Sequence, residues 1–340
     1  MPPSVVPLSE VPAELLLEFL GRVGMTREVA AWRYLDEGFN RGRNRGFAWV
    51  RRGRVEGMIG TIPFRISGPG AAKEVNWSSD WILADPSSNP GMGMLLLRRA
   101  IESSVALFAL GGNENTRRLL PRVATHTVPD AALGMHLLLR SGALLRRIDQ
   151  RGMLGRLPKP RLLYMIPLRW VPGAGSSPDM RTEPGVSRQI APLLDSRREE
   201  DWSPHYDFTY VSWQIGRSPL IRCWTSYSSS AGEPAAGVVY WTSAATGEFW
   251  RLALWYQRGC RDRLDAVLRH AVSEIYRRGG MAVSAIVSRL DTDVQGALRA
   301  RGFLPLGPRR PLYVCAGQDD SSVSELSGLS YLDTDLGYRF

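Results

Sequence analysis

The feature that most constrains the fold of this chain is an order of elements that occurs twice along it. In the first half, alternation over residues 75–84 predicts a strand, residues 93–103 predict an amphipathic helix, and the wholly apolar run 105–110 predicts a strand buried on both faces. The second half repeats the order over the segments 249–257, 261–278 and 281–287. Antiparallel strands precede both series, so we infer an internal duplication at domain scale.

Length and composition agree with two globular domains. The chain has 340 residues, about twice the usual length of one domain, and is 44% hydrophobic and 22% charged. The spacing from Trp32 to Gly57 nearly equals the spacing from Trp213 to Gly237. Residues 171–186 are rich in Pro, Gly and Ser and lack periodicity, which is typical of a linker.

We therefore expect three parts: an N-terminal domain over residues 1–165, a linker over 166–200 and a C-terminal domain over 201–340. The expected fold class is α/β, with each domain built as a mixed, mostly antiparallel twisted sheet flanked by helices.

A glycine turn opens the first-half helix, and its sequence excludes two common phosphate-binding motifs. A Walker A loop ends in Gly-Lys-Ser/Thr, whereas Gly93 is followed by Met94 and Leu95. A dinucleotide-binding fingerprint needs a small residue three places after its second glycine, and Leu96 stands there. The turn that includes Gly91 and Gly93 can still hold a pyrophosphate, because glycines allow close approach and a helix N-terminus presents free amides.

The strand, polar loop, G-x-G and apolar helix resemble motif A of the GNAT superfamily of acyl-CoA-dependent N-acyltransferases, Q/R-x-x-G-x-G/A. Residues 88–93 occupy the six motif positions; both glycines match, and Ser88 replaces the leading Gln/Arg. The resemblance covers about residues 10–150. Over 201–315 it is topological, because Cys260 and Asp262 occupy the glycine positions. The whole chain is similar to tandem-GNAT proteins of bacteria, including some thought to act on polysaccharide precursors.

The resemblance implies an acyl-CoA site in the first half, with acetyl-CoA or another acyl-CoA as cosubstrate. The residues that it places there are Ile82, Ala84, Ser88, Asn89, Gly91, Met92, Gly93, Met94 and Asn113. Backbone amides near Ile82 to Ala84 are expected to meet the thioester carbonyl, as in an oxyanion site. The resemblance implies that the degenerate second turn has lost or altered cofactor binding.

The resemblance also implies a general base on the strand before the turn. Asp80 is the leading candidate, because a carboxylate inside an apolar strand needs a partner or a purpose; Glu74 is the second choice. The tyrosine that often serves as acid in this family has no counterpart over 115–123. Tyrosines from the second half could supply it: Tyr206, Tyr210 or Tyr338.

The leading functional hypothesis is an N-acyltransferase that uses an acyl-CoA, acting on a small amine such as an amino sugar. Two alternatives stay open: a non-catalytic GNAT-fold protein that binds a ligand or partner, and a FemAB-like aminoacyltransferase that uses aminoacyl-tRNA. The net charge of +10 comes almost entirely from arginine. Because the arginines are dispersed, we expect a diffuse basic surface and no nucleic-acid partner.

Cysteine, histidine and the N-terminal segment indicate compartment and metal content. The cysteines (Cys223, Cys260 and Cys315) are odd in number and far apart, which favours a reducing compartment over a disulfide framework. The four histidines lack zinc-site spacing, so we expect no metal. The first residues lack a basic region before their apolar run, and we expect a cytoplasmic protein without membrane insertion.

Overall fold

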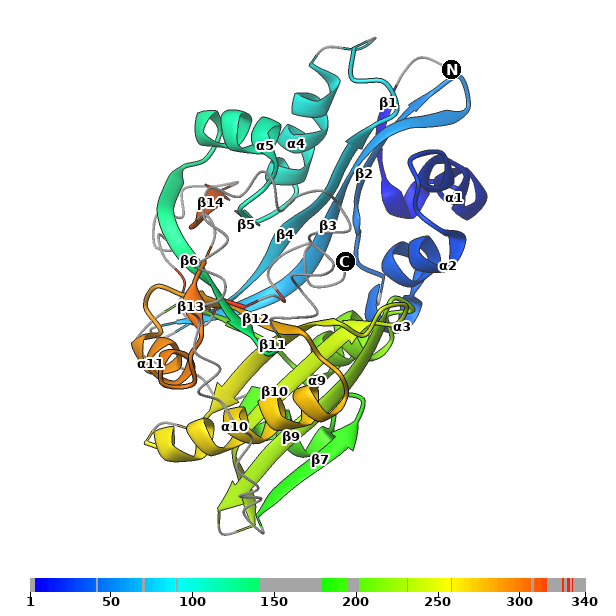
Figure 1. Cartoon of the computed structure of the whole chain (residues 1–340). Helices are drawn as coiled ribbons and strands as arrows, with labels where there is room; N and C mark the ends of the chain where they lie inside the picture. The colour runs from blue at the N-terminus through cyan, green and yellow to red at the C-terminus, as the bar shows by residue number, and fades with distance from the viewer. Residues whose placement is uncertain are drawn as a thin grey trace, which may run out of the picture. The chain divides into compact units, whose positions relative to one another are not determined.

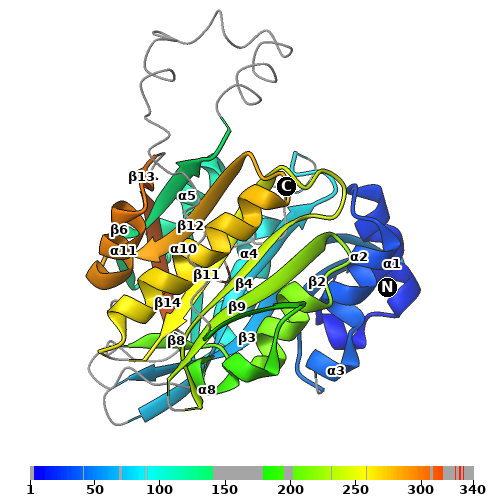
Figure 2. The ribbon, with the colours of Figure 1, turned by 60° about the horizontal axis from the view of Figure 1, so that its bottom comes forward.

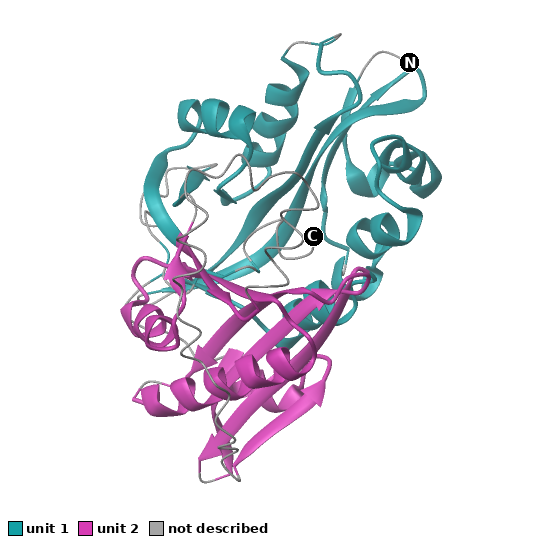
Figure 3. Ribbon diagram, viewed as in Figure 1, with its two compact units in different colours: residues 1–132, 197–219, 309–339 teal, residues 133–196, 220–308, 340 magenta. Residues whose placement is uncertain are grey.

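The computed structural model describes residues 4–40, 42–68, 71–87, 89, 91–140, 179–194, 202–230, 232–257, 259–306, 309–316, 326, 329–330 and 332. The chain forms two compact units, coloured separately in Figure 3. Unit 1 comprises Met1–Ala132, Arg197–Pro219 and Arg309–Arg339, and unit 2 comprises Leu133–Ser196, Leu220–Pro308 and Phe340. Each unit contains a mixed sheet flanked by helices, which confirms the expected fold class. No helix in the described ranges is long and apolar enough to span a bilayer.

The sheet of unit 1 has the strand order β1-β2-β3-β4-β5-β14-β6, and β8 pairs with β3. Its strands are β1 (Ser4–Pro7), β2 (Gly46–Arg51), β3 (Arg54–Gly68), β4 (Ala71–Leu83), β5 (Ala106–Leu110), β6 (His126–Leu138), β8 (Ser203–His205) and β14 (Arg310–Ala316). Strands β1 to β4 are antiparallel, β5 is parallel to β4, and β14 is antiparallel to both β5 and β6.

Helices cover both faces of the unit 1 sheet. The helices are α1 (Ala13–Arg22), α2 (Arg27–Ala30), α3 (Glu37–Asn40), α4 (Met92–Glu102), α5 (Glu114–Leu119), α9 (Phe208–Val211), and the short η1 (Leu8–Glu10), η2 (Ala31–Leu35), η3 (Leu120–Arg122) and η6 (Ser212–Gly216). Phe19 of α1 packs in a cluster with Met58, whereas Leu97 of α4 packs in a cluster with Ile59. Because neighbouring residues of a strand point to opposite faces, α1 and α4 lie on opposite faces of the sheet (Figure 1).

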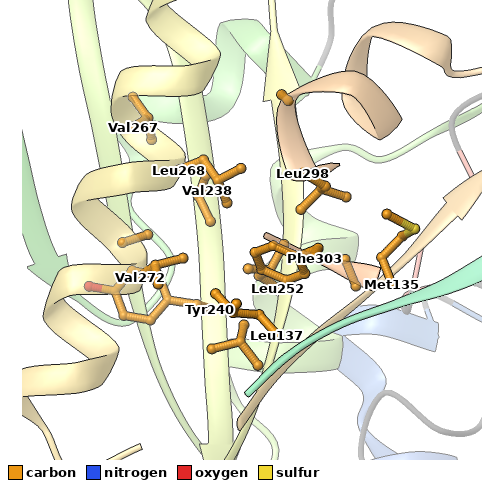
Figure 4. Packing of buried hydrophobic residues seen from close by; sticks show 14 of the residues in the cluster. Met135, Leu137, Val238, Tyr240, Leu252, Val267, Leu268, Val272, Leu298 and Phe303 are labelled. Carbon is orange, nitrogen blue, oxygen red and sulfur yellow. The ribbon is translucent and has the colours of Figure 1, made fainter. Parts of the chain in front are cut away.

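Unit 2 has the strand order β6-β12-β11-β10-β9-β7, and β13 pairs with β6. Its elements are β7 (Met180–Pro184), η5 (Arg188–Ile190), α8 (Ala191–Leu194), β9 (Ile221–Ser230), β10 (Glu233–Ser243), β11 (Phe249–Tyr256), α10 (Arg261–Arg277), β12 (Ala282–Ser288), α11 (Thr292–Ala300), β13 (Leu304–Pro305) and the last part of β6. Helix α10 packs on β9, β10 and β11 (Figure 2). Its predicted apolar side is buried, and Figure 4 shows Val267 and Leu268 among the core residues around Leu252 and Phe303.

The compact units differ from the domain boundaries expected from the sequence. Residues 202–219 and 309–316 belong to unit 1, and residues 133–140 belong to unit 2. In each unit, therefore, one half of the sequence contributes elements to a sheet made mostly by the other half. The apolar pattern could not predict this, because β14 is a strand with a buried centre and such a strand fits any interior slot of a sheet.

Part of the expected linker is also structured. Residues 180–194 form β7, η5 and α8, and β7 pairs antiparallel with β9. Strand β7 is polar and ends at Pro184, which is tolerated at the edge of a sheet and gives no apolar alternation to find. The other linker residues lie outside the described residues, apart from Asp179.

The duplication is visible in a matched pair of helical segments. Helix α2 continues into the π-helix η2, and α9 continues into the π-helix η6; each π-helix has tryptophan at its second position. The rings of Trp32 and Trp213 stack with centroids 5.5 Å apart. Each indole donates to the other residue's carbonyl, at 2.9 Å from Trp32 and 3.2 Å from Trp213. Such a reciprocal contact is typical of a two-fold relation between equivalent segments.

Candidate active site

Strand β4 carries a bulge at the predicted base. Gly60 pairs with Ser79, and Met58 pairs with Ile82, so Asp80 and Trp81 together face the single residue Ile59. This is the pattern of a β-bulge, which adds one residue to one strand and bends it. Asp80 has φ +40°, a left-handed conformation that costs a non-glycine residue about 1–2 kcal/mol.

Strands β4 and β5 separate just before the bulge. Their paired register covers Asn76 with Leu107 and Trp77 with Phe108, and among the described residues it ends there. Strand β4 continues to Leu83 and β5 continues to Leu110. From Ser78 onward the β5-facing edge of β4 therefore has no ladder partner on β5 among the described residues, and we call this the gap beside β4.

The amides along this part of β4 alternate in direction. The Ala84 amide donates to the Glu56 carbonyl at 2.9 Å, which makes these residues a hydrogen-bonded pair of the β3–β4 ladder. By the alternation of an antiparallel ladder, the Ile82 amide also points to β3, and the Leu83 amide points away from it, toward the β5 side. Within the expected range Ile82 to Ala84, the Leu83 amide is thus the one that points to the β5 side; its role toward a thioester stays a prediction.

The glycine turn begins α4 as the sequence predicts. Gly91 is the N-cap residue with φ +94°, a conformation that favours glycine, and α4 starts at Met92 with no side-chain cap. The Met92 amide donates to the Asn89 carbonyl at 3.2 Å. The amides of Gly93 and Met94 belong to the first turn of α4, whose amides have no acceptor within the helix. Ser88 lies outside the described residues.

Gly93 packs closely against Trp81. The indole of Trp81 donates to the Gly93 carbonyl at 3.0 Å, and a Cβ at Gly93 would lie 3.3 Å from the same indole nitrogen. The second bulge residue thus holds the first turn of α4 against β4.

Asn113 caps the next helix instead of pointing freely outward. Its side-chain oxygen accepts from the Thr116 amide at 2.9 Å and from the Thr116 hydroxyl at 3.0 Å. The residue is exposed. Its expected contact with an acyl-CoA stays a prediction.

Asp80 is buried and contacts Arg33 and Tyr34. Its side chain is fully buried, and Oδ2 lies 2.6 Å from the Arg33 Nε of a guanidinium that is itself 1% exposed. The Tyr34 hydroxyl donates to the same oxygen at 2.5 Å. Glu74, the second candidate base, is 60% exposed and accepts from Arg43 and Arg65.

Two of the tyrosines proposed as acids make other contacts, and the third lies outside the described residues. The Tyr210 hydroxyl donates to the Leu332 carbonyl at 3.2 Å, and the Tyr206 ring lies 5.9 Å from the Tyr210 ring. Both are buried in unit 1. Tyr338 lies outside the described residues.

The equivalent region of unit 2 lacks the bulge in its described residues. Strands β10 and β11 pair in unbroken register from Ala236 with Tyr256 to Thr242 with Trp250. Helix α10 begins after Cys260 with Asp262 in its first turn, where a carboxylate repels an anion. The β11–β12 pairing of unit 2 also ends early, after Leu252 and Ala285, although β11 continues to Tyr256 and β12 to Ser288. Among the described residues, the bulge and the glycine N-cap distinguish unit 1.

Sequence comparison finds no protein-family profile and no curated protein that matches this chain. The solved structures define its class: the chain has the GNAT fold, in two tandem units.

Two solved structures are similar over nearly the whole chain. Saccharomyces cerevisiae N-myristoyltransferase with bound myristoyl-CoA is 11% identical, with a TM-score of 0.61 over 96% of this chain and 85% of that one. The GCN5-related N-acetyltransferase from Anabaena variabilis ATCC 29413 is 11% identical, with a TM-score of 0.57 over 93% and 73%. At these identities the likeness establishes the fold.

Proposed function

We propose that this protein is an N-acyltransferase that uses acetyl-CoA or another acyl-CoA and acylates a small amine such as an amino sugar. The observation that carries the proposal is the separation of β4 from β5 beside the uncapped first turn of α4. The proposal is supported by the fold shared with N-myristoyltransferase and a GCN5-related N-acetyltransferase.

The chain's own groups match the parts of an acyl-CoA. The first-turn amides of Gly93 and Met94, with the positive end of the α4 dipole, suit the pyrophosphate. The gap beside β4 suits the extended pantetheine arm, whose amides need backbone partners. The Leu83 amide suits the thioester carbonyl, where negative charge develops when the amine nitrogen attacks and before the thiolate leaves.

The general base stays a prediction. The burial of Asp80 against Arg33 and Tyr34 disfavours that role, since a base must reach the proton that it removes. The same observation favours the second candidate function, a protein that binds an acyl-CoA and catalyses nothing. Consumption of acetyl-CoA in the presence of amino sugars would distinguish the enzyme from the binding protein.

Calorimetry with acetyl-CoA tests the cosubstrate. The variant Gly91→Asp should weaken binding about a hundredfold, since like charges about 5 Å apart repel by about 3 kcal/mol at an effective dielectric of about 20. Gly259→Asp is the matched control, because Gly259 also has a positive φ (+83°), no neighbour within 4 Å of an added Cβ, and a place before the equivalent helix. Absence of binding by the wild type, or equal losses in the two variants, would refute the assignment.

A further inference from the structure

The contacts of Asp80 depend on a site prepared by two other elements, η2 and β3. Arg33 and Tyr34 are consecutive residues of the π-helix η2, and both side chains are less than 5% exposed. Gly60 on β3 leaves the space that the tyrosine needs, because a Cβ there would lie 2.6 Å from the Tyr34 hydroxyl. The phenol, the guanidinium and the carboxylate therefore lie in mutual contact, and we call them the Asp80 lock (Arg33, Tyr34 and Asp80).

The bulge is held from both faces of the sheet. On one face the Asp80 lock attaches it to η2, and on the other the Trp81 indole attaches it to Gly93 of α4. Of the non-glycine residues described, just Asp80 and Arg52 have a positive φ. A left-handed conformation of this kind persists where surrounding contacts over-determine it, and the lock supplies such contacts.

The bulge decides which amide faces the gap beside β4. On the N-terminal side of the bulge in β4, Ser79 pairs with Gly60, and on its C-terminal side Ile82 pairs with Met58. The one extra residue reverses the alternation, so Leu83 rather than its neighbours directs its amide to the β5 side. A β4 strand without the bulge would turn the Leu83 amide toward β3.

We propose that Asp80 is a positioning residue: Arg33 and Tyr34 hold it, and it holds the bulge that directs the Leu83 amide at the thioester carbonyl. The part that concerns the carbonyl rests on the proposed function. The part that concerns the bulge is independent of any ligand, and each part has its own measurement.

The variant Tyr34→Phe is a mild perturbation of the Asp80 lock. It removes one hydroxyl and leaves the Arg33–Asp80 ion pair in place, whereas Asp80→Asn buries the guanidinium without that carboxylate and endangers folding. Tyr227→Phe is the matched control, because the buried Tyr227 also donates to a carboxylate, Glu183, at 2.8 Å in unit 2.

The first measurement uses hydrogen exchange of the ligand-free protein. Loss of a hydrogen bond to a buried charge should speed exchange of the Ile82 and Ala84 amides, which donate to β3 beside the bulge, about tenfold in Tyr34→Phe. The control should leave these amides unchanged. Equal exchange in wild type and Tyr34→Phe would overturn the lock, whatever the protein binds.

The second measurement uses acetyl-CoA labelled with carbon-13 at the thioester carbonyl. Hydrogen bonding polarises a carbonyl, so binding to the wild type should move its resonance downfield. Tyr34→Phe should reduce this displacement while the calorimetric Kd stays unchanged, and Tyr227→Phe should preserve both.

An unreduced displacement in Tyr34→Phe would overturn the positioning role. Failure of the wild type to bind acetyl-CoA would instead refute the proposed function, while the exchange result still decides the lock. A pH–rate profile separates positioning from base catalysis: a positioning Asp80 leaves its acidic limb in place in Tyr34→Phe, and a catalytic base would move it.

Discussion

The buried Arg33–Asp80 pair should be among the most costly places in the molecule to remove one charge. Both side chains are 1% exposed or less, and the Arg33 Nε to Asp80 Oδ2 distance is 2.6 Å. Charge centres about 4 Å apart attract by about 4 kcal/mol at an effective dielectric of about 20, close to the 3–5 kcal/mol typical of breaking a buried pair. We therefore expect Asp80→Asn and Arg33→Met each to lower the free energy of unfolding by about 4 kcal/mol.

The double variant Arg33→Met/Asp80→Asn should cost less than either single change, because it leaves no unbalanced charge buried. Urea unfolding followed by circular dichroism and by tryptophan fluorescence measures the cycle, and agreement of the two probes tests two-state behaviour. The exposed pair Arg27–Glu14 is the control: its atoms also approach to 2.6 Å, but the side chains are 67% and 74% exposed, so its cycle should show no measurable coupling. Additive costs for Arg33 and Asp80 would refute the reasoning.

Two further predictions concern the pH dependence of stability and the room for an added methyl group at two glycines. Burial, aided by the Arg277 charge, holds the pKa of His270 below its usual value, so the folded state binds fewer protons than the unfolded state. The free energy of unfolding should therefore fall as the pH drops below about 6.5. Thermal unfolding of the His270→Gln variant should lose this pH dependence. An identical pH dependence in wild type and variant would exclude His270 as the source. Gly60→Ala should destabilise the protein by about 1–3 kcal/mol, because the added methyl group clashes with the Tyr34 hydroxyl. Gly21→Ala lies in a helix and has no neighbour within 4 Å of the added Cβ, so it should stabilise the protein by up to about 1 kcal/mol. Chemical denaturation of both variants measures the contrast, and equal effects would contradict it.

The sequence predicted the elements around the site because their patterns are local. The apolar face of α4, the wholly buried β5 and the glycine turn each follow from residues within one segment. The glycine at position 91 is also explained by its own segment, because the N-cap residue there has a left-handed conformation. Such features need no knowledge of which strands are neighbours.

The Asp80 lock was not predicted, although a signal for it exists. Arg33 stands in the apolar run Val29–Leu35 as Asp80 stands in an apolar strand, and two isolated opposite charges in apolar segments predict a buried pair. The bulge leaves no such signal in the sequence. One extra residue only shifts the apolar–polar alternation along β4, and that alternation is already imperfect. The direction of the Leu83 amide depends on that shift, so the sequence alone predicted only the range Ile82 to Ala84.

The duplicated plan explains why the two units share a fold and differ in their candidate chemistry. Equivalent π-helices carry Trp32 and Trp213, yet the residues that follow these tryptophans differ: Arg33 and Tyr34 in one, Gln214 and Ile215 in the other. Both π-helices belong to unit 1, and the one with the Arg–Tyr sequence contacts the bulge through Asp80. The unbroken β10–β11 ladder of unit 2 has neither a left-handed residue nor a buried carboxylate to hold. A bulge costs ladder hydrogen bonds and backbone strain, so it persists where a partner stabilises it. The lock and the bulge are thus best understood as one device, whose loss in either part should remove the other.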